Sequence, residues 1–167
     1  MANYQITDAD DLSSGGAKTK AKRNIAAIQL LKELELAQRP ASPQEQAILV
    51  RYSGWGIAAD IFTTKPEWTE FREVLEATLT KEEFAAARAS TISAFYTDIN
   101  ITAGIYKGIE QLGFTGGAIL DPSMGATGAF EGTMPAAIAS NSQVTGIELD
   151  SISGRIASQL YPDSTVH

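Results

Sequence analysis

The segment 121–130 combines residue types that can bind a small polar ligand. It follows a short apolar run and holds Gly125 and Gly128 just before a stretch of helical length. Glycines in a strand-to-helix turn let a ligand approach the backbone, and the following helix presents unpaired N–H groups. An acidic residue before such a turn, here Asp121, suits a positively charged ligand group. This segment is the first candidate for a binding site.

A second carboxylate follows at the end of the next apolar run, where Glu148 closes the segment 143–148. In nucleoside- and dinucleotide-binding folds, a carboxylate at this place accepts hydrogen bonds from ribose hydroxyls. An ordinary strand-to-helix turn is the alternative interpretation, since Glu148 alone would be only a polar strand end. Because parallel strands end at the same edge, the pair predicts a nucleoside pocket at the open edge of a small parallel sheet.

The elements that must position these residues alternate between helix and strand after residue 93. Apolar residues first recur at helical spacing, at Ile101, Ile105, Ile109 and Leu112. Apolar runs of strand type and stretches of helical length then alternate, at 116–121, 126–140, 143–148 and 151–160. Pro135 breaks the first of these helical stretches. This order predicts the start of a doubly wound parallel sheet.

After a stretch of loop composition at 8–16, the signals over residues 18–92 are helical. Ser42 to Glu45 form a capping box with proline in the first helical position. Similar signals for the start of a helix begin at Thr64 and Thr80. We predict an all-helical module over residues 1–92, with Trp55 and Trp68 in its core, and a partial Rossmann-like domain over residues 93–167.

Composition narrows the classes of protein. An apolar fraction of 44% and a charged fraction of 20% are typical of a folded soluble chain. There is no cysteine and the only histidine is His167, so we expect no disulfide and no metal site. No run of about 18 apolar residues and no basic-then-apolar leader occurs, which predicts a cytoplasmic protein that does not span a membrane.

Charge is unevenly distributed along the chain. Residues 91–167 hold two basic side chains against seven acidic ones, within a net charge of -7. Such a segment repels a phosphate backbone, so most binding to DNA would have to lie elsewhere. The basic cluster at 18–23 could contact phosphate or be a solvated helix face. The row Glu67, Glu70, Glu73 and Glu76 is either a solvated face or an acidic docking surface.

These motifs resemble a known family. Asp121-Pro-Ser-Met-Gly125 followed by Gly128-Ala-Phe130, with the segment 95–97 upstream and Gly146-Ile-Glu148 downstream, is similar to the S-adenosylmethionine-binding region of amino-type DNA methyltransferases. The chain as a whole resembles the N-terminal region of the helicase–methyltransferase fusion proteins of phages and mobile elements, including the anti-restriction kind. The stretches that carry this wider resemblance are 15–20, 24–31, 52–56, 87–91 and 149–157.

The resemblance implies an α/β fold, in which an all-helical module precedes a partial Rossmann-like methyltransferase domain with an incomplete parallel sheet. It also implies that S-adenosylmethionine is the cofactor and that nine residues bind it: Phe95, Tyr96, Thr97, Asp121, Pro122, Gly125, Gly128, Phe130 and Glu148. The segment 95–97 would lie against the methionine end, Asp121 would face the amino group, and Glu148 would hold the ribose. The sequence departs from the family pattern in two places. The glycine spacing is one residue longer than the family's Gly-x-Gly, and Asp98 stands in place of proline. We expect both departures to weaken the affinity for the cofactor.

The catalytic motif of this class, Asn- or Asp-Pro-Pro-aromatic, does not occur, because none of the six prolines is followed by another. We therefore assign no catalytic residue and expect no methyl transfer by the chain alone. The first hypothesis is the cofactor-binding front end of an adenine-N6 DNA methyltransferase, whose missing remainder would contact DNA. The alternative is a stand-alone anti-restriction or anti-CRISPR inhibitor that binds a host defence complex.

Overall fold

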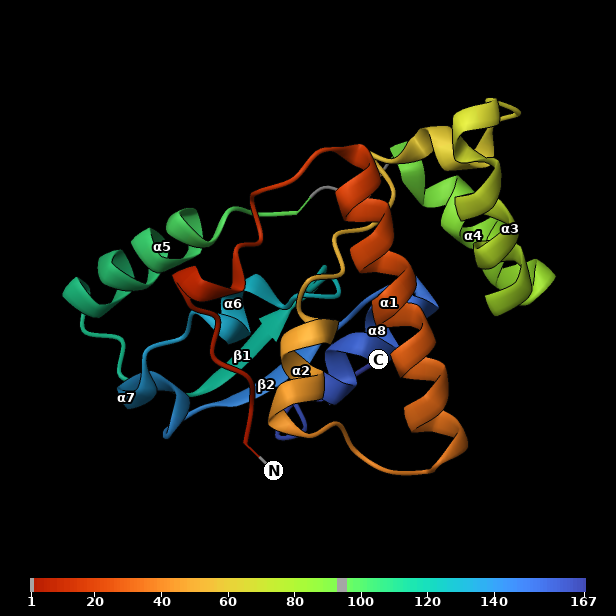
Figure 1. The fold of residues 1–167 in the computed structure, drawn as a ribbon. Helices are drawn as coiled ribbons and strands as arrows, with labels where there is room; N and C mark the ends of the chain where they lie inside the picture. Colours follow the sequence, from red (N-terminus) through yellow and green to blue (C-terminus); the bar gives the residue numbers. More distant parts are fainter. Residues whose placement is uncertain (1, 93–95) are drawn as a thin grey trace.

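The computed structural model describes residues 2–92 and 96–167 (Figure 1). The first half is helical, and the second half adds a three-stranded parallel sheet with helices around it. The structure is thus a mixed helix and strand fold, compatible with the predicted α/β class. The described helices include none with the length and hydrophobicity that a membrane crossing requires.

Helix α1, Ala17–Leu36, is the longest element of the protein. It begins after Gly16, so the basic cluster lies within its first two turns. Its buried face is largely apolar and includes Ile28, Leu31 and Leu34, which solvent does not reach. This spacing of three and four residues is the reason that α1 is helical and that it packs on the core.

Two of the three predicted helix starts form as expected. Helix α2, Pro43–Leu49, has a capping box in which Ser42 and Glu45 exchange hydrogen bonds, and α4, Lys81–Ala89, has the same arrangement at Thr80. The third start differs, because a 3-10 turn, Pro66–Trp68, precedes α3, Thr69–Thr78. Three further 3-10 turns complete the described irregular helices: Asp8–Asp10, Ala59–Phe62 and Ser90–Ile92.

The sheet consists of β1, Ala118–Asp121, β2, Gln143–Gly146, and β3, Thr165–Val166, in that spatial order. Both pairings are parallel. The first crossover contains two short helices, α6, Ala129–Gly132, and α7, Ala136–Ala139; the second is α8, Ser151–Leu160. Pro135 separates α6 from α7, as expected of a residue that cannot donate a backbone hydrogen bond.

Helix α5, Ile99–Gln111, precedes β1 and stands at the outer side of the sheet (Figure 1). It packs through Tyr106, whose ring lies 6.3 Å from the ring of Phe130. The predicted stripe is only partly buried, since Ile101, Ile105 and Leu112 are exposed. Ile105 and Leu112 border an apolar groove of about 550 Å³ along β1. Among the described strands, β1 pairs only with β2, so its outer edge is free.

One core serves both predicted halves of the chain. The largest buried cluster joins Leu31 of α1 and Leu49 of α2 to Ile156 and Tyr161 of the α8 region. Trp55 is fully buried in this cluster and Trp68 nearly so, which confirms the predicted core position of both rings. The secondary structure therefore changes near residue 92, as predicted, but the packed interior continues across this boundary.

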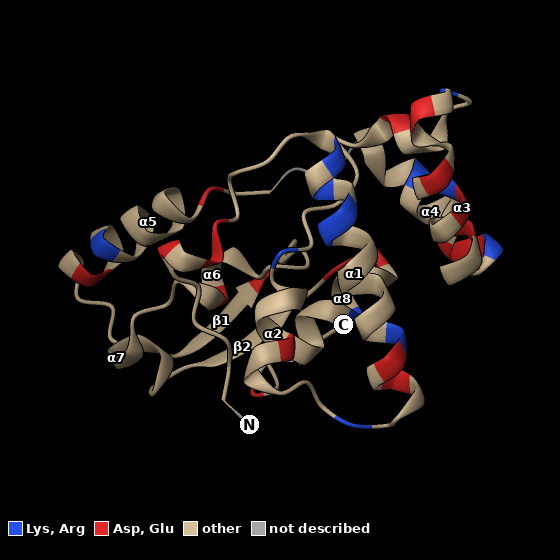
Figure 2. Ribbon diagram, viewed as in Figure 1, with Lys and Arg blue, Asp and Glu red and all other residues tan. Residues whose placement is uncertain are grey.

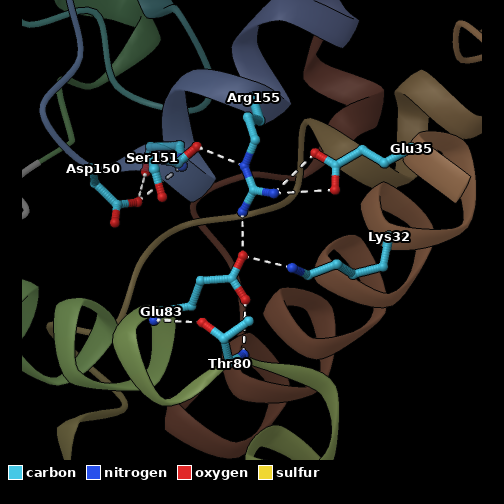
Figure 3. Close-up of polar contacts among 8 residues, drawn as sticks. Lys32, Glu35, Thr80, Glu83, Asp150, Ser151 and Arg155 are labelled. Atoms are coloured by element: carbon cyan, nitrogen blue, oxygen red, sulfur yellow. Dashed lines mark hydrogen bonds and ion pairs between the residues drawn. The ribbon is translucent and has the colours of Figure 1, made fainter. Parts of the chain in front are cut away.

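An ion network also ties the two halves together (Figure 3). Arg155 of α8 contacts Glu35 of α1 at 3.0 Å and Glu83 of α4 at 2.6 Å. Lys32 of α1 lies 2.5 Å from the same Glu83 oxygen. Because these side chains are partly buried, their charges are less screened than on an open surface. The network fixes α4 against the helix that follows β2.

Candidate functional site

The two sequence segments predicted to meet do meet at the carboxyl end of the sheet. Ile147 donates a backbone hydrogen bond to Asp121 at 2.8 Å, and Met124 donates one to Ile147 at 3.1 Å. These bonds extend the β1–β2 pairing beyond the strands themselves. The turn after β1 and the end of β2 therefore lie side by side, as the spacing of Asp121 and Glu148 predicts.

The Glu148 carboxylate is the centre of this edge. One oxygen accepts a hydrogen bond from the backbone N–H of Gly125 at 2.8 Å, and the other accepts one from the N–H of Asp150 at 2.8 Å. Gly125 has a φ of 67°, in the left-handed region that favours glycine. Each carboxylate oxygen can accept a second hydrogen bond. Glu148 thus orders the turn and retains acceptor capacity for a ligand.

A cleft of about 400 Å³ opens over Glu148, and we call it the Glu148 cleft. One wall comes from the α/β half, with Ser123, Gly125, Glu148, Leu149, Asp150 and Ser153. The opposite wall comes mainly from the helical half, with Tyr52, Gly54, Ala86, Ala89, Ser90 and Tyr96. Its volume falls in the range of about 300–1,000 Å³ that is usual for small-molecule sites. Residues of both halves of the chain therefore form the cleft.

Tyr96 lies between two glycines at the centre of this cleft. A Cβ atom on Gly54 would be 2.9 Å from the Tyr96 ring, and one on Gly125 would be 3.6 Å away. Gly54 has a φ of 64°, so both its conformation and its close approach to the ring favour glycine. Burial raises the pKa of Tyr96 and of Tyr52, so both phenols are neutral donors and acceptors.

The structure places the other predicted residues elsewhere. Asp121, Pro122 and Phe130 line the apolar groove beside α5, not the Glu148 cleft. Burial raises the pKa of Asp121, and its carboxylate accepts a hydrogen bond from the N–H of Ser123 at 3.0 Å. Because strand side chains alternate between faces, Asp121 shares the α5 side of β1 with Ile119. Asp121 and Glu148 are neighbours along the edge but open on different hollows.

Three further predicted residues have separate surroundings. Gly128 is buried with a φ of 50°, and a Cβ atom there would be 2.4 Å from the ring of Tyr161. Thr97 is exposed and borders a larger cavity next to the Glu148 cleft. Phe95 lies outside the described residues. Of the nine predicted residues, Tyr96, Gly125 and Glu148 are therefore the ones that come together in the cleft.

Sequence reasoning did not anticipate that the helical half contributes to the site. Asn24 of α1 is fully buried, and its side chain donates to the carbonyl of Gly54 at 2.6 Å and accepts from the N–H of Ser53 at 2.8 Å. These two bonds hold the loop that carries Gly54 against Tyr96. An amide on the apolar face of α1 was the available signal, because a buried polar side chain needs partners.

The described residues contain no group of three or more His, Cys, Asp or Glu side chains that could hold a metal ion. Comparison of the chain with protein-family models, curated proteins and solved structures returned no match. The chemistry of the site therefore has to be argued from its own geometry. That geometry offers a carboxylate, backbone N–H groups and two neutral phenols around a cleft, and these groups suit a ligand with hydroxyls and a planar ring.

Proposed function

We propose that this chain is the cofactor-binding part of an adenine-N6 DNA methyltransferase and that the Glu148 cleft takes the nucleoside of S-adenosylmethionine. The observation that carries the proposal is the contact between Glu148 and Gly125 at the open edge of a parallel sheet. Nucleoside-binding α/β folds place a carboxylate and a glycine turn in this relation. The motif resemblance supplies the identity of the nucleoside.

The residues of the cleft have distinct roles in this proposal. Glu148 accepts hydrogen bonds from the ribose hydroxyls with its remaining lone pairs. The rings of Tyr52 and Tyr96 provide apolar surface for the adenine. The free edge of β1 adds support, because a further strand could extend the sheet there.

The chain carries no Asn- or Asp-Pro-Pro-aromatic motif, so we do not expect it to transfer a methyl group by itself. Its part is to bind and orient the cofactor. Methylation of DNA by the isolated chain would contradict this division of roles. A methylation assay with tritiated S-adenosylmethionine and mixed-sequence DNA measures it directly.

Isothermal titration with S-adenosylmethionine tests the binding proposal. We expect saturable binding at or below about 1 mM, which corresponds to a binding free energy of about -4 kcal/mol. Adenosine should compete, whereas guanosine should not. No heat of binding at millimolar cofactor, with the protein folded by circular dichroism, would contradict the proposal.

A second candidate function is inhibition of a host defence complex, and the acidic row on α3 and the 3-10 turn before it favours this function. Glu67, Glu70, Glu73 and Glu76 are all exposed and form no ion pair with any described residue. Figure 2 shows acidic residues gathered on this helix. Such a row could compete with nucleic acid for a basic groove. Co-purification with restriction or CRISPR effector complexes tests it, and failure with both kinds would contradict it.

A further inference from the structure

Residues 2–12 precede α1, and we call this segment the strap. It runs past α6 on its way to α1 (Figure 1). The backbone N–H of Tyr4 donates a hydrogen bond to the carbonyl of Leu160 at 2.8 Å. The N–H of Ile6 donates one to the carbonyl of Gly132, also at 2.8 Å. A segment that is held by isolated bonds of this kind opens at a lower free-energy cost than the packed helices.

The strap forms part of the wall of a cavity of about 570 Å³, which we call the strap cavity. The strap residues that line it are Thr7, Asp8, Asp11 and Leu12. The cavity adjoins the Glu148 cleft, because Tyr52 and Tyr96 line both hollows. Movement of the strap would therefore open the strap cavity to solvent.

Glu131 of α6 lies under the strap, beside the bond that Ile6 makes. It is only 4% exposed, and neither of its carboxylate oxygens has a hydrogen-bond partner among the described residues. One oxygen packs beside Gly128, where a Cβ atom would lie 3.0 Å away. On the strap, Asn3 and Gln5 share with Glu131 the lining of a hollow of about 260 Å³. The strap therefore covers α6 at this carboxyl group.

The groups that face Glu131 offer no compensating positive charge. They are the acids and phenols of the elements packed around it: Asp121 of β1, Tyr106 of α5, Tyr161 after α8, Asp163 before β3 and, next to Tyr161, Tyr4 and Asp10 of the strap. Glu131 forms no ion pair within residues 2–92 and 96–167. A buried carboxylate without a partner or water is strongly disfavoured, so the group stays protonated while it is covered.

We infer that the strap is a lid over the strap cavity and that ionisation of Glu131 releases it. While Glu131 is protonated, it stays buried and the strap remains bonded to α6 through Ile6. The ionised carboxylate needs water. The strap is the neighbour that can move, because β1 belongs to the sheet and Tyr161 to the main core. Release of the strap hydrates the carboxylate and removes one wall of the cavity.

The lid should open as the pH rises through neutrality. Burial raises the pKa of Glu131 from 4.5 to about 7, so the covered group loses its proton near neutral pH. The open state binds fewer protons, since there the carboxyl group is in water and its pKa returns toward 4.5. The device does not depend on which ligand the Glu148 cleft takes.

Amide hydrogen exchange of the full chain, resolved by residue with NMR, tests the lid. Tyr4 and Ile6 report on the strap, and Ile28 in the buried face of α1 reports on unfolding of the whole protein. Protection factors are compared from pH 5 to pH 8, because they are corrected for the intrinsic pH dependence of exchange. The variants are Glu131→Gln and the control Glu110→Gln, an exposed carboxylate of α5 that forms no described ion pair.

We expect Tyr4 and Ile6 to be less protected than Ile28 at each pH, because the strap opens without global unfolding. In the unchanged chain their protection should fall about 10- to 100-fold between pH 5 and pH 8, as follows from the shift in the pKa of Glu131 on opening. Glu110→Gln should show the same fall. Glu131→Gln cannot ionise, so its strap should keep nearly constant protection over this interval.

Two other groups of the strap do not titrate in this interval. Hydrogen bonds from Ser14 and Arg23 lower the pKa of Asp11, which is therefore ionised throughout. Burial and a hydrogen bond to Asp10 raise the pKa of Tyr4 to about 12, so its phenol is neutral throughout. Neither group accounts for a change in protection between pH 5 and pH 8.

Three results would overturn the inference. Strap protection that does not vary with pH in the unchanged chain would show that the strap opens while Glu131 stays covered. An equal fall in Glu131→Gln would assign the pH dependence to another group. Equal protection of Ile6 and Ile28 at every pH would show that the strap opens only when the whole protein unfolds.

Discussion

The carboxylate of Glu148 and the backbone nitrogen of Gly125 lie 2.8 Å apart, although 22 residues separate them in the sequence. This bond joins the turn after β1 to the end of β2. A ligand that hydrogen-bonds to Glu148 therefore meets a turn whose N–H groups are already placed. Preorganisation of this kind lowers the entropy cost of binding, because less of the site has to become ordered.

Replacement of Glu148 by glutamine should therefore affect both stability and ligand binding. The amide retains one acceptor oxygen, so one of the bonds to Gly125 or Asp150 is lost, at a cost of about 1–2 kcal/mol. Thermal unfolding measures the loss of stability. The control is Glu110→Gln, an exposed side chain of α5 with no described side-chain contact, which should change the free energy of unfolding by less than about 0.5 kcal/mol. Equal stability of the two variants would contradict the structural role of Glu148.

Gly128 should tolerate no side chain. Alanine at this position would have a φ of 50° and a Cβ atom 2.4 Å from the ring of Tyr161. Left-handed backbone and overpacking together should destabilise the protein by about 2–4 kcal/mol. Gly104→Ala is the matched control, because Gly104 lies inside α5 with no atom near its Cβ position. That control should be stabilising by about 0.5–1 kcal/mol. Denaturant unfolding distinguishes the opposite signs.

Asn24 should act on the cleft through the loop that it holds. Asn24→Ala leaves the Ser53 N–H and the Gly54 carbonyl without their partners, which should cost about 1–3 kcal/mol. Gln29→Ala, an exposed site on the same helix, is the control and should change stability little. If the loop positions Tyr96, the near-ultraviolet circular dichroism of the tyrosines should also change in Asn24→Ala. A stable variant with an unchanged spectrum would show that the loop keeps its position without the Asn24 side chain.

Local signals in the sequence were sufficient for much of the fold. The capping boxes at Ser42 and Thr80 form as predicted because their hydrogen bonds join residues only three positions apart. Helix α8 has the predicted bounds, and β1 and β2 lie inside the predicted runs. Strand β3, Thr165–Val166, was not predicted, since two residues carry too little periodicity to be recognised.

The site was less predictable, because its walls depend on tertiary packing. The distance from Asp121 to Glu148 along the chain correctly placed the two segments at one edge. It could not show that Asp121 opens on the α5 groove while Glu148 opens on a cleft shared with Tyr52 and Gly54. That division depends on how the helical half packs on α8. The packing depends on long-range contacts such as Asn24 with Gly54 and Arg155 with Glu83, which no local pattern specifies.

Glu83 should make the protein less stable at low pH. Burial alone would raise its pKa, but hydrogen bonds from Lys32, the Thr80 N–H and Arg155 lower that pKa from its ordinary value of 4.5 to about 2. A depressed pKa means that the folded state binds fewer protons than the unfolded state between these values. Stability should therefore fall as the pH drops from about 4.5 to about 2.

The variant Glu83→Gln should have a shallower decline in melting temperature over this interval than the unchanged chain. Glu82→Gln, the exposed neighbour on α4, is the control and should retain the full decline. Melting temperatures measured from pH 2 to pH 5 decide the matter. Identical slopes in both variants would show that other carboxylates account for the acid sensitivity.

Glu131 should have the opposite effect in a higher pH interval. It is buried beside Gly128, neither carboxylate oxygen has a described hydrogen-bond partner, and burial raises its pKa from 4.5 to about 7. The folded state then binds more protons than the unfolded state between these values, so stability should fall as the pH rises from about 4.5 to about 7.

Glu131→Gln removes the ionisation, so the melting temperature of this variant should change less with pH over this interval. The gain of the variant over the unchanged chain should be larger at pH 8 than at pH 4.5. A difference that does not vary with pH would mean that the Glu131 carboxylate finds a partner, or water, when it ionises.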